Sequence, residues 1–379
     1  MQFFRGLTRK KQSSSSASAE RRKNEQDYYL KNGSSVLEEF LALCDGNCRI
    51  PIRYFTATEI ENAIKHSESK MELSDVYMVT GSLNNRPVLV RFNRSCQLNI
   101  YRDIAITAQM SHLKNVLRLV GCCLEFEEPV MVYEYVEGIS LSDLLFKKGN
   151  SNRKSLLSWG NRLRIANEVA SAIVFLHTEF TTPIIHRDIA PSKVIIDQNN
   201  GVAKILDFSL SISLPPGKLE MKSEDGVLGT LGYIAPENGS YDIITQKIDV
   251  YSFGVLLFEL LTGKKMVEMV DSAISKEPID CEEVNKSSIE ERNAMDTTFE
   301  NLHPNIVDRY IRENSVIDIV DPTIFEEHGI EIQQQLEDYI DLVKRCTTYN
   351  GENRPYMIHV ARELRRIEKC FRALTIGQN

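Results

Sequence analysis

The chain has 379 residues, a hydrophobic fraction of 42%, a charged fraction of 26% and a formal net charge of −8. This length predicts a globular protein of two lobes or two small domains, because a typical domain has roughly 100–200 residues. The negative charge argues against a nucleic-acid binder, which usually carries a basic face. The eight cysteines lack the context of a disulfide framework and the spacing of a zinc site, so we expect reduced thiols in a cytosolic protein.

The N-terminal segment contains basic clusters around a run of four serines, Ser13–Ser16. It has few large apolar residues, and we therefore predict that residues 1–26 are disordered. Residue 2 is glutamine, which excludes the usual myristoylation signal, and no apolar run approaches the ~20 residues of a membrane span. We expect a cytoplasmic protein; a peripheral contact of the basic N-terminus with the plasma membrane stays open.

The pattern of the chain predicts a sheet-rich part followed by a helical part. Residues 27–54 are expected to form a helical extension, and residues 55–136 a lobe with strands at 87–92 and 129–133 and a helix at 99–112. Thr56 and Glu59 form the signature of a capping box. Residues 137–373 form the second, helical lobe. Residues 250–261 within it are nearly all apolar, which predicts a helix buried on all sides. The fold class is therefore α+β with two lobes.

Four short motifs resemble those of protein kinases in their order and spacing. They are His186-Arg187-Asp188, Asp207-Phe208-Ser209, Ala235-Pro236-Glu237 and Asp249-Val250-Tyr251-Ser252-Phe253-Gly254. These motifs correspond to the catalytic loop, the metal-binding turn, the end of the activation segment and a buried helix. Arg354 is placed to pair with Glu237. The resemblance covers roughly residues 55–373 and favours plant receptor-like kinases. It implies structural roles for His186, Phe208, Glu237, Asp249 and Arg354.

The parts that handle phosphate in a kinase are altered here. The glycine-rich loop should precede Val76, but residues 69–75 contain no glycine and carry the acidic Glu72 and Asp75. Such a loop needs glycines so that backbone N–H groups can approach the phosphates. Arg91 stands where the strand lysine is expected and Asp103 where its helix glutamate is expected. We predict that they pair to hold the lobe together rather than to catalyse.

The catalytic loop has lost further contacts. Ala190 replaces the phosphate-contacting lysine, Lys193 replaces the metal-binding asparagine, and Ser209 replaces a glycine. Asp188 and Asp207 remain, and we interpret both as vestiges of a catalytic and a metal-binding residue. A degenerate nucleotide site is expected from Arg91, Asp103, Lys193 and the hinge residues Tyr133, Glu134 and Tyr135. No cofactor is required, and weak binding of ATP with Mg²⁺ stays open.

Together the degenerate loop, Ala190, Lys193 and Ser209 resemble the plant ZRK family of receptor-like cytoplasmic pseudokinases. This resemblance implies an adaptor in plant innate immunity, bridging the leucine-rich repeats of a coiled-coil nucleotide-binding (NLR) receptor and receptor-like cytoplasmic kinases modified by bacterial effectors. It implies no nucleic-acid partner and no transmembrane segment. The alternative is a weakly active or nucleotide-binding serine/threonine kinase of the same group.

Two segments suit an adaptor. The acidic insert 266–302 has ten acidic and three basic residues and thus carries −7 of the net −8; a solvated loop is the competing interpretation. The other is the activation segment 207–237, which we expect to order when it meets a modified partner. The candidate contact residues of both segments are Lys218, Lys222, Ser223, Ile279, Val284, Ile289, Met295 and Phe299.

Overall fold

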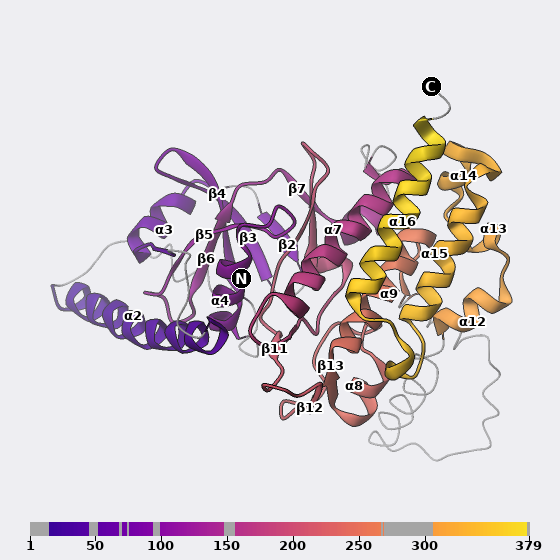
Figure 1. Cartoon of the computed structure of the whole chain (residues 1–379). Helices are drawn as coiled ribbons and strands as arrows, with labels where there is room; N and C mark the ends of the chain where they lie inside the picture. Colours follow the sequence, from indigo (N-terminus) through magenta and orange to yellow (C-terminus); the bar gives the residue numbers. More distant parts are fainter. Residues whose placement is uncertain are drawn as a thin grey trace, which may run out of the picture. The chain divides into compact units, whose positions relative to one another are not determined.

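The computed structural model describes residues 15–44, 52–67, 70–73, 76–93, 99–147, 156–266, 268 and 306–376. The chain divides into two compact units. Residues 1–137 with 206–209 form the first, here called the N-lobe, and residues 138–205 with 210–379 form the second, the C-lobe. The N-lobe is built around a sheet and the C-lobe is mostly helical (Figure 1). The predicted α+β, bilobal kinase-like fold is confirmed.

The N-lobe sheet has six strands in the order β1-β5-β6-β4-β3-β2. Their bounds are β1 Arg53–Tyr54, β2 Lys70–Leu73, β3 Val76–Leu83, β4 Arg86–Asn93, β5 Leu119–Cys123 and β6 Val130–Glu134. All neighbours are antiparallel except β1 and β5. Asn84 and Asn85 join β3 to β4 with φ of 51° and 61°. Asparagine tolerates this left-handed conformation, which a two-residue hairpin of type I′ requires.

Two short helices pack on this sheet. Helix α3 (Ala57–Ile64) begins with the predicted capping box, because the Thr56 side chain accepts from the Glu59 backbone N–H and Glu59 accepts from that of Thr56. Helix α4 (Ile100–Met110) is capped by Asn99 and lies within the predicted range 99–112. The apolar cluster between sheet and α3 includes Phe55, Ile60, Val88, Val90, Cys123 and Val132.

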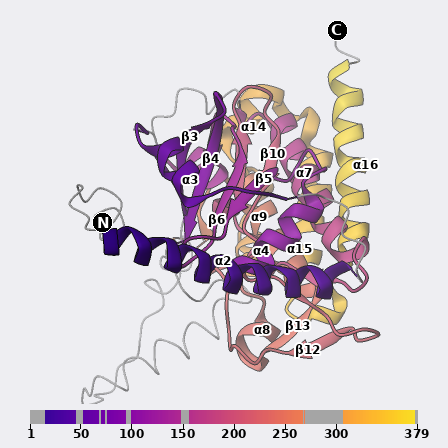
Figure 2. The same ribbon diagram turned by 90° about the vertical axis from the view of Figure 1, so that its left-hand side faces the viewer.

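Helix α2 (Ser15–Cys44) corrects the prediction that residues 1–26 are disordered, at least for residues 15–26. Residues 15–26 are mostly polar, but they include alanine, glutamate and arginine, which are good helix formers. Arg21 pairs with Glu25 one turn later at 2.6 Å and with Glu61 of α3 at 2.9 Å. Further along, α2 runs beside α4 (Figure 2). There the Glu39 carboxylate accepts from Asn99 and Arg102.

In its described residues the C-lobe has mostly helices, together with three small sheets. Its helices are α5 Leu141–Phe146, α7 Trp159–Thr178, α8 Pro236–Tyr241, α9 Gln246–Thr262, α12 Ile306–Glu313, α13 Val316–Ile319, α14 Pro322–His328, α15 Gln333–Cys346 and α16 Met357–Ile376. Three short 3₁₀ turns span Pro191–Lys193, Gly329–Ile332 and Gly351–Asn353. The strands are β7 Gly138–Ser140, β9 Val194–Asp197 and β10 Ala203–Ile205 in one sheet, β8 Ile184–Ile185 with β11 Ile212–Ser213, and β12 Glu220–Lys222 with β13 Ile243–Thr245.

Helix α9 is the centre of the C-lobe core. All of its residues from Ile248 to Thr262 are buried, which confirms the prediction made from its apolar run. A buried ion pair lies beside it: the Arg162 guanidinium donates to Asp321 at 2.6 Å and to the Leu260 carbonyl at the end of α9. Packing around α9 therefore ties α7 to the segment that opens α14. Among the helices described, none is both long and apolar enough to cross a bilayer.

Candidate functional site

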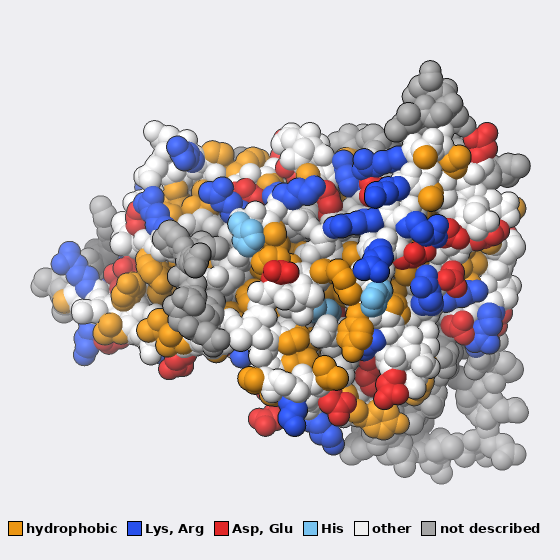
Figure 3. Space-filling view, in the orientation of Figure 1, with side chains coloured by type: hydrophobic (Ala, Val, Ile, Leu, Met, Phe, Trp, Pro, Cys, Tyr) orange, Lys and Arg blue, Asp and Glu red, His pale blue; other side chains and the backbone are white. Residues whose placement is uncertain are grey.

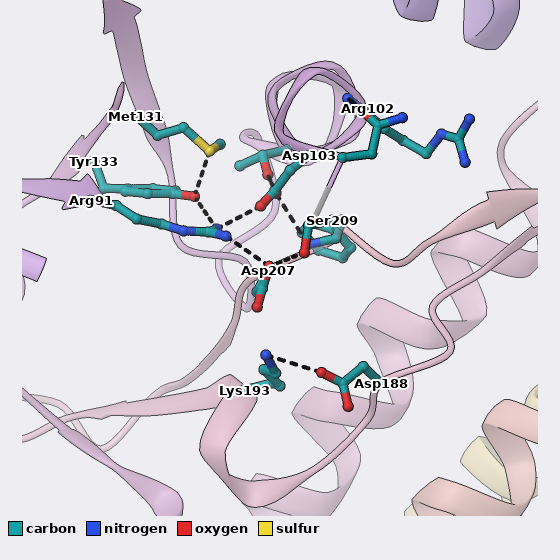
Figure 4. Close-up of polar contacts among 12 residues, drawn as sticks. Arg91, Arg102, Asp103, Met131, Tyr133, Asp188, Lys193, Asp207 and Ser209 are labelled. Atoms are coloured by element: carbon teal, nitrogen blue, oxygen red, sulfur yellow. Dashed lines mark hydrogen bonds and ion pairs between the residues drawn. The ribbon is translucent and has the colours of Figure 1, made fainter. Parts of the chain in front are cut away.

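The guanidinium of Arg91 joins three parts of the N-lobe (Figure 4). Arg91 lies on β4, and its side chain is fully buried. One terminal nitrogen donates to Asp103 at 2.6 Å and to the Tyr133 hydroxyl at 3.2 Å, and the other donates to Asp207 at 2.7 Å. The predicted Arg91–Asp103 pair is thus formed. The contact with Asp207 adds the metal-binding turn to the same cluster.

Asp103 lies on the first turn of α4, where the helix dipole favours a negative charge. Its second oxygen accepts from Thr107 at 2.9 Å and from the Phe208 backbone N–H at 3.1 Å. A carboxylate one methylene shorter than glutamate therefore reaches Arg91 and still anchors the chain next to Asp207. Every one of these bonds stabilises a charged Asp103.

Asp207 has a left-handed backbone, with φ of 70°. The oxygen that accepts from Arg91 also accepts from the Ser209 hydroxyl at 2.6 Å. In an active kinase the corresponding carboxylate holds Mg²⁺. A metal would have to compete here with an arginine and with the hydroxyl that replaces the expected glycine.

In this cluster, burial and the neighbouring charges shift the pKa values of Arg91 and Asp103 in opposite directions. Burial by itself would lower the pKa of Arg91, but Asp103 and Asp207 raise that pKa well above its ordinary value. Burial raises the pKa of Asp103, and the Arg91 charge works in the opposite direction. Burial also raises the pKa of the Tyr133 hydroxyl, which stays neutral and can donate to the Met131 sulfur. Arg91 is the permanent cation on which both aspartates depend.

The turn between β2 and β3 stands in the place of the glycine-rich loop. The two strands are paired up to Leu73 and Val76, so only two residues connect them. These residues, 74 and 75, lie outside the described part of the chain. Residues 69–75 contain no glycine, so this stretch lacks the backbone freedom with which a glycine-rich loop approaches phosphates.

In the C-lobe, Asp188 is bonded on both oxygens. One accepts from the backbone N–H of Thr230 at 2.8 Å and from its hydroxyl, and the other pairs with the Lys193 ammonium at 3.0 Å (Figure 4). Both charged side chains are buried, Asp188 at 5% and Lys193 at 3% exposure. Lysine has only donors and cannot ligate a cation. Lys193 stands at the position of the metal-binding asparagine, and its observed contact is with Asp188, the catalytic-base position.

Asp249 holds the backbone of the catalytic-loop motif. Its carboxylate accepts from the backbone N–H groups of His186 and Arg187 at 2.8 and 2.9 Å, and bonds His177 at 2.8 Å. Arg187 has φ of 68°, so this loop needs external support to keep its shape. That support comes from the α9 helix, as predicted, and involves no substrate.

Glu237 and Arg354 form the predicted pair, and the structure shows that it is bidentate, at 2.7 and 2.9 Å. The same guanidinium donates to the carbonyls of Thr348, Tyr349 and Lys247. Arg354 is almost fully buried. These bonds link the end of the activation segment to the start of α9 and to the segment that precedes α16.

The remaining predicted site residues are spread over both units. Tyr133 is buried behind Arg91, Glu134 ends β6, and Tyr135 is exposed. His186 and Phe208 are both fully buried. Lys218 and Lys222 are exposed on the activation segment, while the Ser223 hydroxyl accepts from Arg187 at 3.3 Å. Ile279, Val284, Ile289, Met295 and Phe299, like nearly all of the acidic insert, lie outside the described residues.

Three hydroxyl contacts of the site were not predicted, and neither were the pairs of Arg91 with Asp207 and of Lys193 with Asp188. The hydroxyl contacts are the Tyr133–Arg91 bond, the Ser209–Asp207 bond and the Thr230–Asp188 bonds. A hydroxyl has no sequence pattern that names its acceptor, and Thr230 lies 42 positions from Asp188. Nor did the sequence show that the activation segment already contains β11 and β12 in the isolated chain. Within the described residues, no group of three or more His, Cys, Asp or Glu side chains is arranged to hold a metal.

This architecture, with its paired motif residues, defines a protein-kinase-like fold, and the protein kinase domain family model matches residues 83–364. The chain is 35% identical to the Arabidopsis thaliana serine/threonine-protein kinase ZRK4 over 91% of its own length and 93% of that protein. It is 35% identical to ZRK1 of the same plant over 91% and 93%. It is 34% identical to the Arabidopsis non-functional pseudokinase ZED1 over 90% and 96%. The chain belongs to the ZRK family, whose members carry both kinds of name.

Proposed function

We propose that this chain is a catalytically inactive pseudokinase that serves as an adaptor in plant innate immunity. The observation that carries the proposal is the pairing of each vestigial aspartate with a cation of the chain itself. Arg91 bonds Asp207 and Lys193 bonds Asp188. In an active kinase the first carboxylate holds Mg²⁺ and the second accepts the substrate proton. Each task needs a free carboxylate oxygen, and in this chain Arg91 and Lys193 each occupy an oxygen of one of the two aspartates.

The lack of glycine in residues 69–75 and the presence of Ala190 support the same proposal. Phosphoryl transfer depends on positioned charges around the phosphates, and loss of one such stabiliser typically costs ~2.7–4 kcal/mol of transition-state energy. The glycine loop, the lysine replaced by Ala190 and the asparagine replaced by Lys193 are all changed. Asp249 and Arg354 keep the shape of the loops without any of that chemistry. A scaffold with these properties fits an adaptor.

A phosphotransfer assay tests inactivity. Purified protein would be incubated with labelled ATP and Mg²⁺ or Mn²⁺, beside Asp188→Asn and Asp207→Asn. We expect the three proteins to give the same background. Phosphotransfer by the wild type that both substitutions abolish would overturn the proposal and establish the alternative, a weakly active serine/threonine kinase.

Nucleotide binding needs its own measurement, because a ligand of the folded state raises apparent stability whether or not it reacts. We expect no thermal shift of the wild type with ATP and Mg²⁺. A variant that combines Arg91→Lys, Ala190→Lys, Lys193→Asn and Ser209→Gly should gain a shift, and Arg91→Lys alone is its matched control. A clear shift of the wild type would favour a nucleotide-binding pseudokinase over a pure scaffold.

The adaptor role is tested by co-purification. Full-length protein would be expressed with candidate coiled-coil NLR receptors, and then with receptor-like cytoplasmic kinases modified by bacterial effectors. Deletion of 266–302 is expected to weaken the receptor contact. Replacement of 218–226 by a Gly/Ser linker is expected to weaken recruitment of the modified kinase. Unchanged recruitment by both variants would remove these two segments from the proposal.

A further inference from the structure

Helix α16 carries a continuous basic stripe on its exposed face. Arg362, Arg365, Lys369 and Arg372 follow one another at spacings of three and four residues, and all four are exposed. Such spacing places side chains on one line along a helix. From Arg362 to Arg372 the line spans ten residue steps, or about 15 Å at 1.5 Å per step. Ile358, four residues before Arg362, extends it with an exposed apolar side chain.

The stripe is opposite the face by which α16 packs into the C-lobe. Val360, Leu364, Ile367 and Phe371 are buried, and Asn167 of α7 donates to the Leu364 carbonyl and to Glu368. The cations therefore contribute nothing to the packing of the helix. They stand on the outermost surface of this part of the C-lobe.

Most of the stripe has no acidic partner. The two acidic residues of α16 are engaged, Glu363 by Arg366 and Glu368 by Arg372. Arg362, Arg365 and Lys369 make no ion pair within the described part of the chain. Surface arginines elsewhere in the C-lobe do pair, as Arg309 does with Glu313 and Arg345 with Asp341, each one turn away. Arg362, Arg365 and Lys369 differ from these paired arginines.

Helix α7 packs beside α16 and carries one further cation. Gly160, Arg164 and Asn167 share one stripe of α7; a Cβ at Gly160 would meet Phe371 of α16, and Asn167 bonds Glu368. Arg164 lies between these two points, is half-buried and donates to the Gly201 carbonyl. Figure 3 shows Lys and Arg side chains gathered over the part of the C-lobe where Figure 1 places α16 and α7.

Like charges at spacings of three and four residues destabilise a helix, so the stripe has a cost inside the folded protein. We propose that the exposed face of α16 is an electrostatic docking surface for an anionic lipid bilayer. The partner must be extended and negative, because the cations lie along a straight helix and project outward. An apolar side chain in line with the cations suits a headgroup region, and long basic side chains can keep their charge at its phosphates.

The net charge of −8 does not oppose this assignment. Residues 266–302 account for −7, which leaves −1 for the rest of the chain. Electrostatic attraction acts within about a Debye length, ~8 Å at physiological ionic strength. A membrane surface therefore interacts mainly with the charges nearest to it, which here are the cations of α16.

The test measures binding of the full chain to vesicles. The probes are phosphatidylcholine vesicles with and without phosphatidylserine. The test variant is Arg362→Glu, Arg365→Glu and Lys369→Glu. The matched control is Arg22→Glu, Lys23→Glu and Lys31→Glu. These three residues are exposed cations of α2, and their replacement changes the net charge by the same amount. This control also tests the rival contact through the basic N-terminal part. A second variant, Arg362→Gln, Arg365→Gln and Lys369→Gln, is used if the glutamate variant fails to fold.

We expect the wild type to bind only the anionic vesicles, more weakly as salt rises. The α16 triple should lose more than about a hundredfold in binding, because each basic residue near an anionic leaflet contributes about fivefold and each introduced glutamate adds repulsion. The α2 triple should stay close to the wild type. Equal loss in both triples, binding to neutral vesicles, or no binding by the wild type would overturn the proposal. Binding to a polyglutamate peptide but not to anionic vesicles would reassign the stripe to an acidic protein partner.

Discussion

The Arg91 guanidinium holds the Asp207 carboxylate at 2.7 Å while it also holds Asp103 at 2.6 Å. One buried cation thus ties β4, α4 and the metal-binding turn together, where an active kinase would use a lysine and a metal ion. The consequence can be measured as stability, because two buried carboxylates depend on a single positive charge.

Replacing Arg91 with methionine should destabilise the protein by about 3–5 kcal/mol, the usual cost of breaking a buried ion pair on one side. Asp103 and Asp207 would have to bind protons, so the deficit relative to the wild type should shrink as pH falls. Urea unfolding at neutral and acidic pH measures both effects. Arg366→Ala is the control, because it removes an exposed pair and should cost at most ~1 kcal/mol. Equal costs for the two variants would contradict the role given to Arg91.

Glu259 provides a pH dependence with a known direction. Burial raises the pKa of this α9 carboxyl from 4.5 to about 7, although it accepts from Tyr233 and from the Met266 backbone N–H. A raised folded-state pKa means that the folded protein binds the proton more tightly than the unfolded chain. The stability contributed by this proton is complete below pH 4.5 and is lost as pH rises to about 7. The loss is about 3 kcal/mol at ~1.4 kcal/mol per pH unit.

Glu259→Gln should remove that part of the pH dependence, because glutamine has an acceptor for Met266 and no titration. The measurement is the free energy of unfolding of both proteins from pH 4.5 to 8. Their difference should grow in favour of the glutamine variant as pH rises. A difference that is constant over this range would show that Glu259 does not titrate there.

Asn32 anchors α2 to the N-lobe. Its buried amide donates to the Leu124 and Phe126 carbonyls at 2.9 Å and accepts from Tyr101. Asn32→Leu leaves these groups without partners, at about 1–3 kcal/mol for a buried unsatisfied group. Amide hydrogen exchange should then accelerate throughout α2. Ser35→Ala, on the same helix at an exposed bond, should leave the exchange unchanged. Equal exchange in both variants would mean that other contacts hold the helix.

Gly254 allows α9 and α15 to approach closely. A Cβ at this position would lie 2.7 Å from the Cys346 Cβ and 2.8 Å from a Thr347 methyl. Gly254→Ala should therefore cost about 1–3 kcal/mol by overpacking, despite the better helix propensity of alanine. Gly239→Ala is the matched control, because the nearest atom there is 3.8 Å away. Thermal or urea unfolding should separate the two variants, and similar stabilities would show that α15 can shift.

The elements with strong local signals could be predicted from the sequence. The continuous apolar run of α9, the Thr56–Glu59 box and the kinase motifs each depend on neighbouring residues or on a fixed spacing. The ion pairs of Arg91 with Asp103 and of Glu237 with Arg354 followed from the motif positions.

Contacts made over long distances could not be predicted in this way. Asp207 lies 116 positions from Arg91, and only the folded lobe shows that one guanidinium reaches both aspartates. The first turns of α2 looked like a disordered tail because their support, the pair of Arg21 with Glu61, comes from another helix. The pair of Lys193 with Asp188 was not predicted, because the spacing of the two residues does not show that a 3₁₀ turn brings them together.

The replacement of two lysines has a consequence for chemical proteomics. Reagents that deliver an acyl group from a nucleotide need a nucleophilic amine at the strand or catalytic-loop lysine. Arg91, whose pKa is raised well above its ordinary value by two carboxylates, offers a guanidinium that stays protonated, and Ala190 offers no amine. The amine of Lys193, three positions further on, is buried and paired with Asp188. A survey that counts kinases by such labelling would therefore pass over this protein even in tissue where it is abundant.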